Sequence, residues 1–179
     1  MSIEHSTTML SRQPFLQTIL TMSMHGPYDE AKYDVDMPSL PSYSLQMNNY
    51  LKHYHYTDRQ LGRYFNFLKA KGVYDNSIIV IVSDHEAHSK FLNMPKEQIG
   101  DELLPFIIAH ANIDSENAWT GDMNQMDVFT TLMDLLRLDT DWYGLGSSVL
   151  DKKRYENRLN ETTQKVSDLI VESNYWKVN

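Results

Sequence analysis

The fold of this chain is decided by one stretch, Ile78-Ile79-Val80-Ile81-Val82-Ser83-Asp84-His85-Glu86-Ala87-His88. Its first five residues are β-branched and apolar, and they are too few to span a membrane and show no helical period. Such a run is typical of a strand buried on both faces of a parallel sheet. It ends in a cluster of polar side chains that can bind metal ions. We therefore expect a core strand followed by a loop that carries chemistry.

Two interpretations of this loop stay open. In open α/β sheets ligands bind just beyond the carboxyl ends of the strands. There, the carboxylate of Asp84 and the imidazole of His85 would supply half of a metal site. Alternatively, the segment is a polar loop in which Asp84 caps the next turn and His85 is solvated. The spacing does not decide between them, because short motifs often match by chance.

Length and composition limit the class of protein. The chain has 179 residues, of which 41% are hydrophobic and 22% charged, which is typical of a single globular domain with a genuine core. A formal net charge of −8 argues against nucleic acid as the main partner, because phosphate contacts need clustered Lys and Arg. No signal peptide is evident. The absence of cysteine excludes disulfides and thiolate chemistry.

The elements before the central stretch predict where a second functional side chain lies. Phe15–Met22 is rich in large apolar residues and predicts a strand, followed by the turn signal His25-Gly26-Pro27. Apolar residues at spacings of three and four predict a helix over about 42–71, ended by Gly72. Two parallel neighbours joined by a helix cross over right-handedly, so their carboxyl ends share one edge. We expect His25 to converge there with Asp84 and His85.

Other segments give less specific expectations. His53 and His55 flank Tyr54, and we expect both on a partly exposed face of the predicted helix. The remaining predicted elements are an edge strand within Leu103–Ala109, ended by His110 and marked by Pro105, a helix over Asn124–Arg137, and a last helix over Glu161–Ser173.

Four stretches together resemble the C-terminal half of the sulfatase family, in the alkaline phosphatase superfamily. They are Thr21–Tyr28, Tyr56–Arg63, Tyr74–His85 and Asn124–Leu136. Within the family the chain is most similar to the lipoteichoic-acid-synthase-like phosphoglycerol transferases. The resemblance covers roughly Pro14–Leu150 and keeps the family's order, which makes it more specific than any single motif.

The resemblance implies a fold class and a domain organisation. The fold would be a partial alkaline-phosphatase-like, sulfatase-like α/β layered domain, with a mostly parallel sheet flanked by helices. Residues 1–13 would be a truncated lead-in segment and residues 14–150 the C-terminal half of the sulfatase-like domain. Residues 151–179 would be a C-terminal helical tail.

The resemblance also implies roles for individual residues. Asp84 and His85 match the family's metal ligands, and His25 matches the histidine that contacts the phosphate or sulfate group being transferred. The cofactor would be a divalent cation (Mn²⁺, Mg²⁺, Zn²⁺ or Ca²⁺), with the site empty or weakly occupied in this chain alone. Glu86 and His88 depart from the family's pattern. They are either extra ligands or part of a polar loop.

The catalytic nucleophile is not expected among these residues. The family attacks with a threonine or a formylglycine, which comes from its N-terminal half together with an acidic ligand. The resemblance therefore implies a fragment of a metal-dependent enzyme that acts on phosphate or sulfate esters and is inactive alone. The alternative is a non-catalytic binding or scaffolding module that keeps the fold.

Location and assembly follow from the same resemblance. The parent protein would act outside the cytoplasm, in the periplasm or on the outer face of a bacterial membrane, and would be anchored upstream. This chain itself would be soluble. A truncated sheet leaves apolar surface uncovered, so we also expect self-association through that face.

Overall fold

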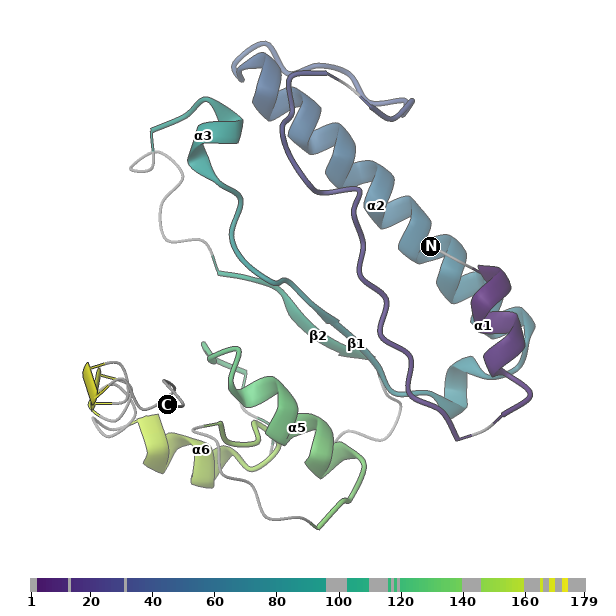
Figure 1. The fold of residues 1–179 in the computed structure, drawn as a ribbon, viewed down its shortest axis with the longest axis vertical. Helices are drawn as coiled ribbons and strands as arrows, with labels where there is room; N and C mark the ends of the chain where they lie inside the picture. The colour runs from purple at the N-terminus through teal and green to yellow at the C-terminus, as the bar shows by residue number, and fades with distance from the viewer. Residues whose placement is uncertain are drawn as a thin grey trace. The chain divides into compact units, whose positions relative to one another are not determined.

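The structure is a computed structural model that forms two compact units, Met1–His110 and Ala111–Asn179, described here one at a time (Figure 1). The described residues are 3–12, 14–30, 32–95, 103–109, 116, 118, 120–139, 146–159, 165, 168–169 and 172–173. Within them, no helix combines the length and the apolar character needed to cross a membrane.

The first unit is organised around the 26-residue helix α2, Leu45–Ala70 (Figure 1). Ser44 caps its start, because the hydroxyl accepts a hydrogen bond from the Met47 backbone N–H at 3.0 Å. Gly72 follows its end with φ +67°, a left-handed conformation that favours glycine. The helix predicted over 42–71 is therefore confirmed, including the residue that stops it.

The chain before α2 runs along this helix in the opposite direction. A short helix, α1 (Ile3–Met9), precedes it, and the buried Ser6 hydroxyl of α1 donates to the Gln17 side chain at 3.0 Å. The hydrogen bonds that join this segment to α2 include Gln17–Tyr64 (3.4 Å), Ser23–Thr57 (2.7 Å) and Tyr28–Asn49 (2.8 Å). The residue numbers rise along the segment (17, 23, 28) while those of their partners on α2 fall (64, 57, 49), so the segment and the helix run antiparallel.

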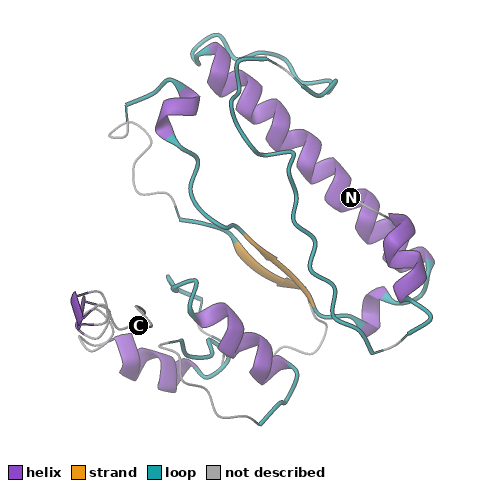
Figure 2. Cartoon of the chain, viewed as in Figure 1, coloured by secondary structure: helices purple, strands orange, loops and turns teal. Residues whose placement is uncertain are grey.

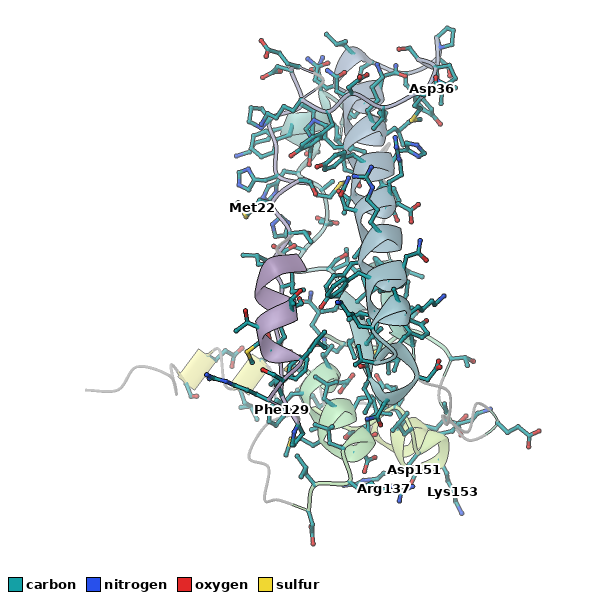
Figure 3. The ribbon with its side chains drawn as sticks, turned by 90° about the vertical axis from the view of Figure 1, so that its right-hand side faces the viewer. Met22, Asp36, Phe129, Arg137, Asp151 and Lys153 are labelled. Atoms are coloured by element: carbon teal, nitrogen blue, oxygen red, sulfur yellow. The ribbon has the colours of Figure 1, made fainter. Side chains whose placement is uncertain are left out.

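The strand predicted over Phe15–Met22 is wrong in the described part of the chain. Figure 2 shows this segment as an extended loop, and it pairs with no other strand there. Leu16, Leu20 and Met22 are 83%, 75% and 63% exposed, and Met22 projects away from α2 (Figure 3). Its composition favours an extended backbone, but a strand also needs a neighbour for its N–H and C=O groups. The neighbouring helix α2 bonds to this part of the chain through side chains such as Tyr64 and Thr57, which do not form a strand ladder.

The sheet of the first unit is antiparallel rather than parallel. β1 (Ile79–Val82) pairs with β2 (Phe106–Ala109), with Ile79 opposite Ala109 and Val82 opposite Phe106. Both strands were expected, but the mostly parallel sheet is not formed by the described residues, which contain this two-stranded sheet alone. The reason is that β1 pairs with the next strand along the chain, β2, while Phe15–Met22 lies along α2, bonded to it through Gln17 and Tyr64. His110 lies outside the described residues.

The second unit is held together by a buried carboxylate. Asp127 begins α5 (Asp127–Leu135) and is 1% exposed. It accepts hydrogen bonds from the Asn124 N–H (2.9 Å), the Ser147 N–H (2.9 Å) and the hydroxyl of Tyr155 (2.7 Å). Tyr155 belongs to α6 (Lys152–Leu159), so the Asp127 side chain joins α5 to α6.

The helix predicted over Asn124–Arg137 is confirmed by α5, while the helix predicted over Glu161–Ser173 lies mostly outside the described residues. The expected domain limits at residues 13 and 150 stay predictions.

Replacing Tyr155 by Phe should lower the free energy of unfolding of the second unit by about 1–3 kcal/mol, because it removes one donor from a buried carboxylate. The sequence range of this unit, Ala111–Asn179, contains all three tryptophans of the chain, Trp119, Trp142 and Trp176, so urea unfolding is followed by tryptophan fluorescence. Tyr54→Phe, at a 56% exposed position of α2, is the control and should change nothing. Equal unfolding curves for Tyr155→Phe and the unchanged protein would contradict this prediction.

Candidate metal and phosphate site

The loop after β1 places a carboxylate beside an imidazole. His85 Nε2 lies 3.6 Å from Asp84 Oδ2, and the side chains are 58% and 75% exposed respectively. The other carboxylate oxygen, Oδ1, accepts the backbone N–H of His85 at 2.9 Å. This local hydrogen bond fixes the carboxylate against the residue that follows it.

A second hydrogen bond determines which nitrogen of His85 can bind a cation. Nδ1 lies 2.6 Å from the backbone carbonyl oxygen of Glu86. A carbonyl can only accept, so Nδ1 carries the proton and the neutral ring keeps its lone pair on Nε2. Metal-binding histidines are commonly fixed in this way by a hydrogen bond to the other nitrogen. Asp84 Oδ2 and His85 Nε2 thus lie side by side as two potential metal ligands, an arrangement that fits a divalent cation.

The two further candidates, Glu86 and His88, contact this pair differently. Glu86 meets His85 through its backbone carbonyl, whereas the ring of His88 stacks on that of His85 at 4.9 Å. Within the described ranges, no three His, Asp or Glu side chains gather closely enough to hold a metal ion. The donors therefore fit one part of a divalent site.

His25 lies in the turn that ends the segment along α2. Its backbone N–H donates to the Met22 carbonyl at 3.2 Å, and its Nδ1 lies 2.6 Å from the Gly26 carbonyl oxygen. By the argument used for His85, Nδ1 carries the proton and the exposed ring has Nε2 for a ligand. The turn is anchored below by Tyr28, which is 4% exposed and donates through its hydroxyl to the Met24 carbonyl.

The turn and the loop are neighbours through one aromatic ring. Gly26 is buried against Phe91, so closely that an added Cβ would lie 2.7 Å from Phe91 Cδ2. Phe91 belongs to α3 (Ser89–Leu92) and meets the His88 ring edge-on at 5.7 Å. If His25 approaches Asp84 and His85 as predicted, the contact that brings them together is made by Phe91 of α3 and not by the shared edge of a parallel sheet.

Comparisons with known proteins give the family of this chain. A model of the family described as Sulfatase matches residues 5–138. The chain belongs to the sulfatase family. This confirms the resemblance carried by the four stretches, and the family implies an alkaline-phosphatase-like α/β fold and, in general, metal-dependent chemistry on esters. No solved structure matches the chain.

Curated relatives of this sulfatase-family chain are lipoteichoic acid synthases. Lipoteichoic acid synthase 2 of Bacillus subtilis is 33% identical over 159 residues, which are 80% of this chain and 24% of that protein. Lipoteichoic acid synthase of Staphylococcus aureus is 28% identical over 144 residues, 74% of this chain and 22% of that protein. The chain thus spans about a quarter of the length of the curated relatives it matches.

The residue that the sequence analysis missed is His53. It was expected on a partly exposed face, but it is fully buried, with the rings of Tyr28 and Tyr33 edge-on at 5.3 and 4.9 Å. Neither ring nitrogen has a hydrogen-bond partner in the described structure. A signal was present: Asn49, His53 and Thr57 are spaced by four and share one face of α2. The segment that carries His25 covers that polar face.

Burial makes His53 resist protonation. Its pKa is lowered from the ordinary value of 6.5, chiefly by burial and also by the charge of Lys32. The backbone of Ser23 opposes this lowering of the pKa by more than the charge of Lys32 adds to it, and the backbone of Glu30 opposes it by less, so burial is the deciding cause. In the unfolded chain the same imidazole titrates near 6.5.

We expect the free energy of unfolding to fall as the pH drops below about 6.5, because the unfolded chain then binds a proton that the folded chain excludes at His53. His53→Phe keeps the aromatic contacts and should flatten this part of the profile. The measurement is urea unfolding followed by far-ultraviolet circular dichroism between pH 5 and 8. His55→Phe, two residues along the same helix, is the matched control and should keep the slope. Equal slopes in the two variants would contradict the assignment.

Proposed function

We propose that this chain provides the metal-binding pair and the group-binding histidine of an enzyme that transfers or hydrolyses phosphate or sulfate esters. Its nearest chemistry would be that of the phosphoglycerol transferases. The observation that carries the proposal is Asp84 beside His85, with the His85 lone pair directed to Nε2 by the Glu86 carbonyl, in a sulfatase-family chain.

Each residue then has a distinct task. The Asp84 carboxylate and His85 Nε2 would hold a divalent cation, of which Mn²⁺, Mg²⁺, Zn²⁺ and Ca²⁺ are candidates. When bound, such a cation polarises the ester and helps a hydroxyl nucleophile to ionise. His25 Nε2 would bind the transferred phosphate or sulfate group, as an imidazolium towards its oxygens or as a base towards the incoming hydroxyl.

The nucleophile itself is proposed to lie in sequence outside this chain. A threonine from another part of the parent protein would form the covalent intermediate, and an acidic residue from that part would complete the metal ligands. The length of the curated relatives, about four times that of the matched region, supports this division. Alone, the chain would bind a cation weakly and would turn over no ester.

The site of action and the assembly are also proposals. The parent enzyme would work outside the cytoplasm and be anchored to the membrane, as a phosphoglycerol transferase acting on surface polymers requires. Copies of this chain would associate through apolar residues that the first unit exposes, among them Leu16, Leu20 and Leu103.

Calorimetry with Mn²⁺ and Zn²⁺ tests the metal-binding pair. We expect weak binding, because a firm site takes three or four protein ligands and the described loop provides two. Asp84→Asn should weaken binding further, because the amide carries no negative charge. Asp58→Asn, at an exposed position of α2, is the matched control and should leave the affinity unchanged. Tight stoichiometric binding that survives Asp84→Asn would place the metal elsewhere.

Ester turnover tests the division of labour. The 179-residue chain should be inactive on phosphate and sulfate esters, and a longer protein that includes the upstream segment should be active. In that longer protein His85→Ala should remove most of the turnover. His25→Ala should lower turnover while leaving metal affinity nearly intact, because His25 contacts the transferred group and not the cation.

Two outcomes would overturn the proposal. Metal-dependent turnover by this chain alone would show a self-sufficient site, with Glu86 and His88 as further ligands. An inactive longer protein that still binds its partners would favour the binding or scaffolding module instead.

A further inference from the structure

We propose that Phe91 is a positioning residue that holds the turn of His25 against the loop of Asp84 and His85. Its ring would set the separation between the imidazole that binds the transferred group and the pair that binds the cation. This inference rests on the proposed function, because it assigns Phe91 a role in the same site.

The first observation is the contact on the side of the turn. An added Cβ on Gly26 would lie 2.7, 3.0 and 3.3 Å from three atoms of the Phe91 ring. Side chains do not approach so closely, so the Gly26 backbone lies directly on the ring and no larger residue fits there without movement. His25 is the preceding residue, so the ring limits where its backbone can lie.

The second observation is the contact on the side of the loop. The ring of His88 meets Phe91 edge-on at 5.7 Å and stacks on His85 at 4.9 Å. The Phe91 N–H donates to the His88 carbonyl at 2.9 Å, so both residues belong to one turn of backbone. Two side chains therefore connect the Gly26 backbone to the imidazole that would bind the cation.

The third observation is that α2 holds both α3 and the end of the His25 turn through hydrogen bonds that do not involve the Phe91 ring. The Ser44 hydroxyl at the start of α2 donates to the Leu92 carbonyl at 3.1 Å, and Leu92 is 1% exposed. Asn49, one turn later, donates to the Tyr28 carbonyl at 2.8 Å. The helix thus fixes α3 and the end of the turn, and Phe91 fills the space between them.

A spacing role follows from these contacts together. His25, Asp84 and His85 are all exposed, so their own packing does little to restrain them. Reacting groups must be held within a fraction of an ångström for catalysis, which requires support from packed neighbours. Without the ring, the turn and the loop would border a void and could shift relative to each other.

A nitroxide label gives a direct and metal-independent test. The chain contains no cysteine, so Asp84→Cys creates a single attachment point in the loop. We expect the label to broaden the NMR signals of the His25 imidazole and the Gly26 amide. Phe91→Ala should reduce this broadening about twofold or more, because the cavity lets the turn and the loop move apart. Phe91→Leu, which refills most of the cavity, should restore it.

Phe65→Ala is the matched control. It removes an equal ring from the same unit, where Phe65 packs on Tyr74 at 5.9 Å near the other end of α2. A general loss of stability would affect both alanine variants, whereas positioning predicts loss of broadening only in Phe91→Ala. Equal broadening with and without Phe91 would overturn the inference.

A double-mutant cycle tests the contact with Gly26. Gly26→Ala should lower the free energy of unfolding when Phe91 is present, because the new methyl group meets the ring. The same change should cost much less in the Phe91→Ala background, because the obstacle is gone. Equal losses in both backgrounds would show that the ring is not the neighbour that constrains position 26.

The two proposals fail in distinguishable ways. Addition of Mn²⁺ to the unlabelled chain should broaden the His85 imidazole signals if Asp84 and His85 bind a cation. If Mn²⁺ does not broaden the His85 signals but the nitroxide broadening still depends on Phe91, the proposed function is wrong and Phe91 still sets the spacing of the turn and the loop. If Mn²⁺ broadens the His85 signals but the nitroxide broadening does not depend on Phe91, the proposed function stands and the positioning role of Phe91 is wrong.

Discussion

The first unit depends on the polar face of α2. Asn49, His53 and Thr57 lie one turn apart, and the segment with the His25 turn is held on this face by the Asn49–Tyr28 and Ser23–Thr57 hydrogen bonds. His53 fills the space between them without a hydrogen bond of its own. Burying an imidazole without partners costs free energy, so the aromatic packing around it must offset that cost. The position of the His25 turn is therefore maintained by packing as much as by hydrogen bonding.

Local patterns in the sequence predicted the elements that local interactions determine. The β-branched run of Ile78–Val82 predicted β1, and the spacing of three and four predicted α2 with its stop at Gly72. The strand predicted over Phe15–Met22 was wrong because a strand needs a neighbouring strand to pair with, and side-chain composition does not say which neighbour is present. The same composition suits an extended segment that lies along a helix.

The candidate site shows the same division. His25, Asp84 and His85 could be named as candidates because each stands in a recognisable motif, and their assignment to the site stays a prediction. The contact that joins them could not be predicted. Gly26 was interpreted as part of a turn signal, and Phe91 lies in a stretch with no periodic pattern. Their approach depends on two separate anchors on α2, at Ser44 and at Asn49, and a contact between residues 65 positions apart leaves no local signature.

The exposure of the loop determines what its two donors can do. At 75% and 58% exposure, Asp84 and His85 remain hydrated, and water screens their attraction for a cation. A third ligand would add a bond, but covering the loop with protein would also remove that screening and strengthen every electrostatic contact within it. The exposure of the two side chains therefore predicts that the proposed cation binding is weak, and that burial of the same pair would strengthen it. The strength of the proposed cation binding would therefore depend on desolvation of the pair as well as on the number of ligands.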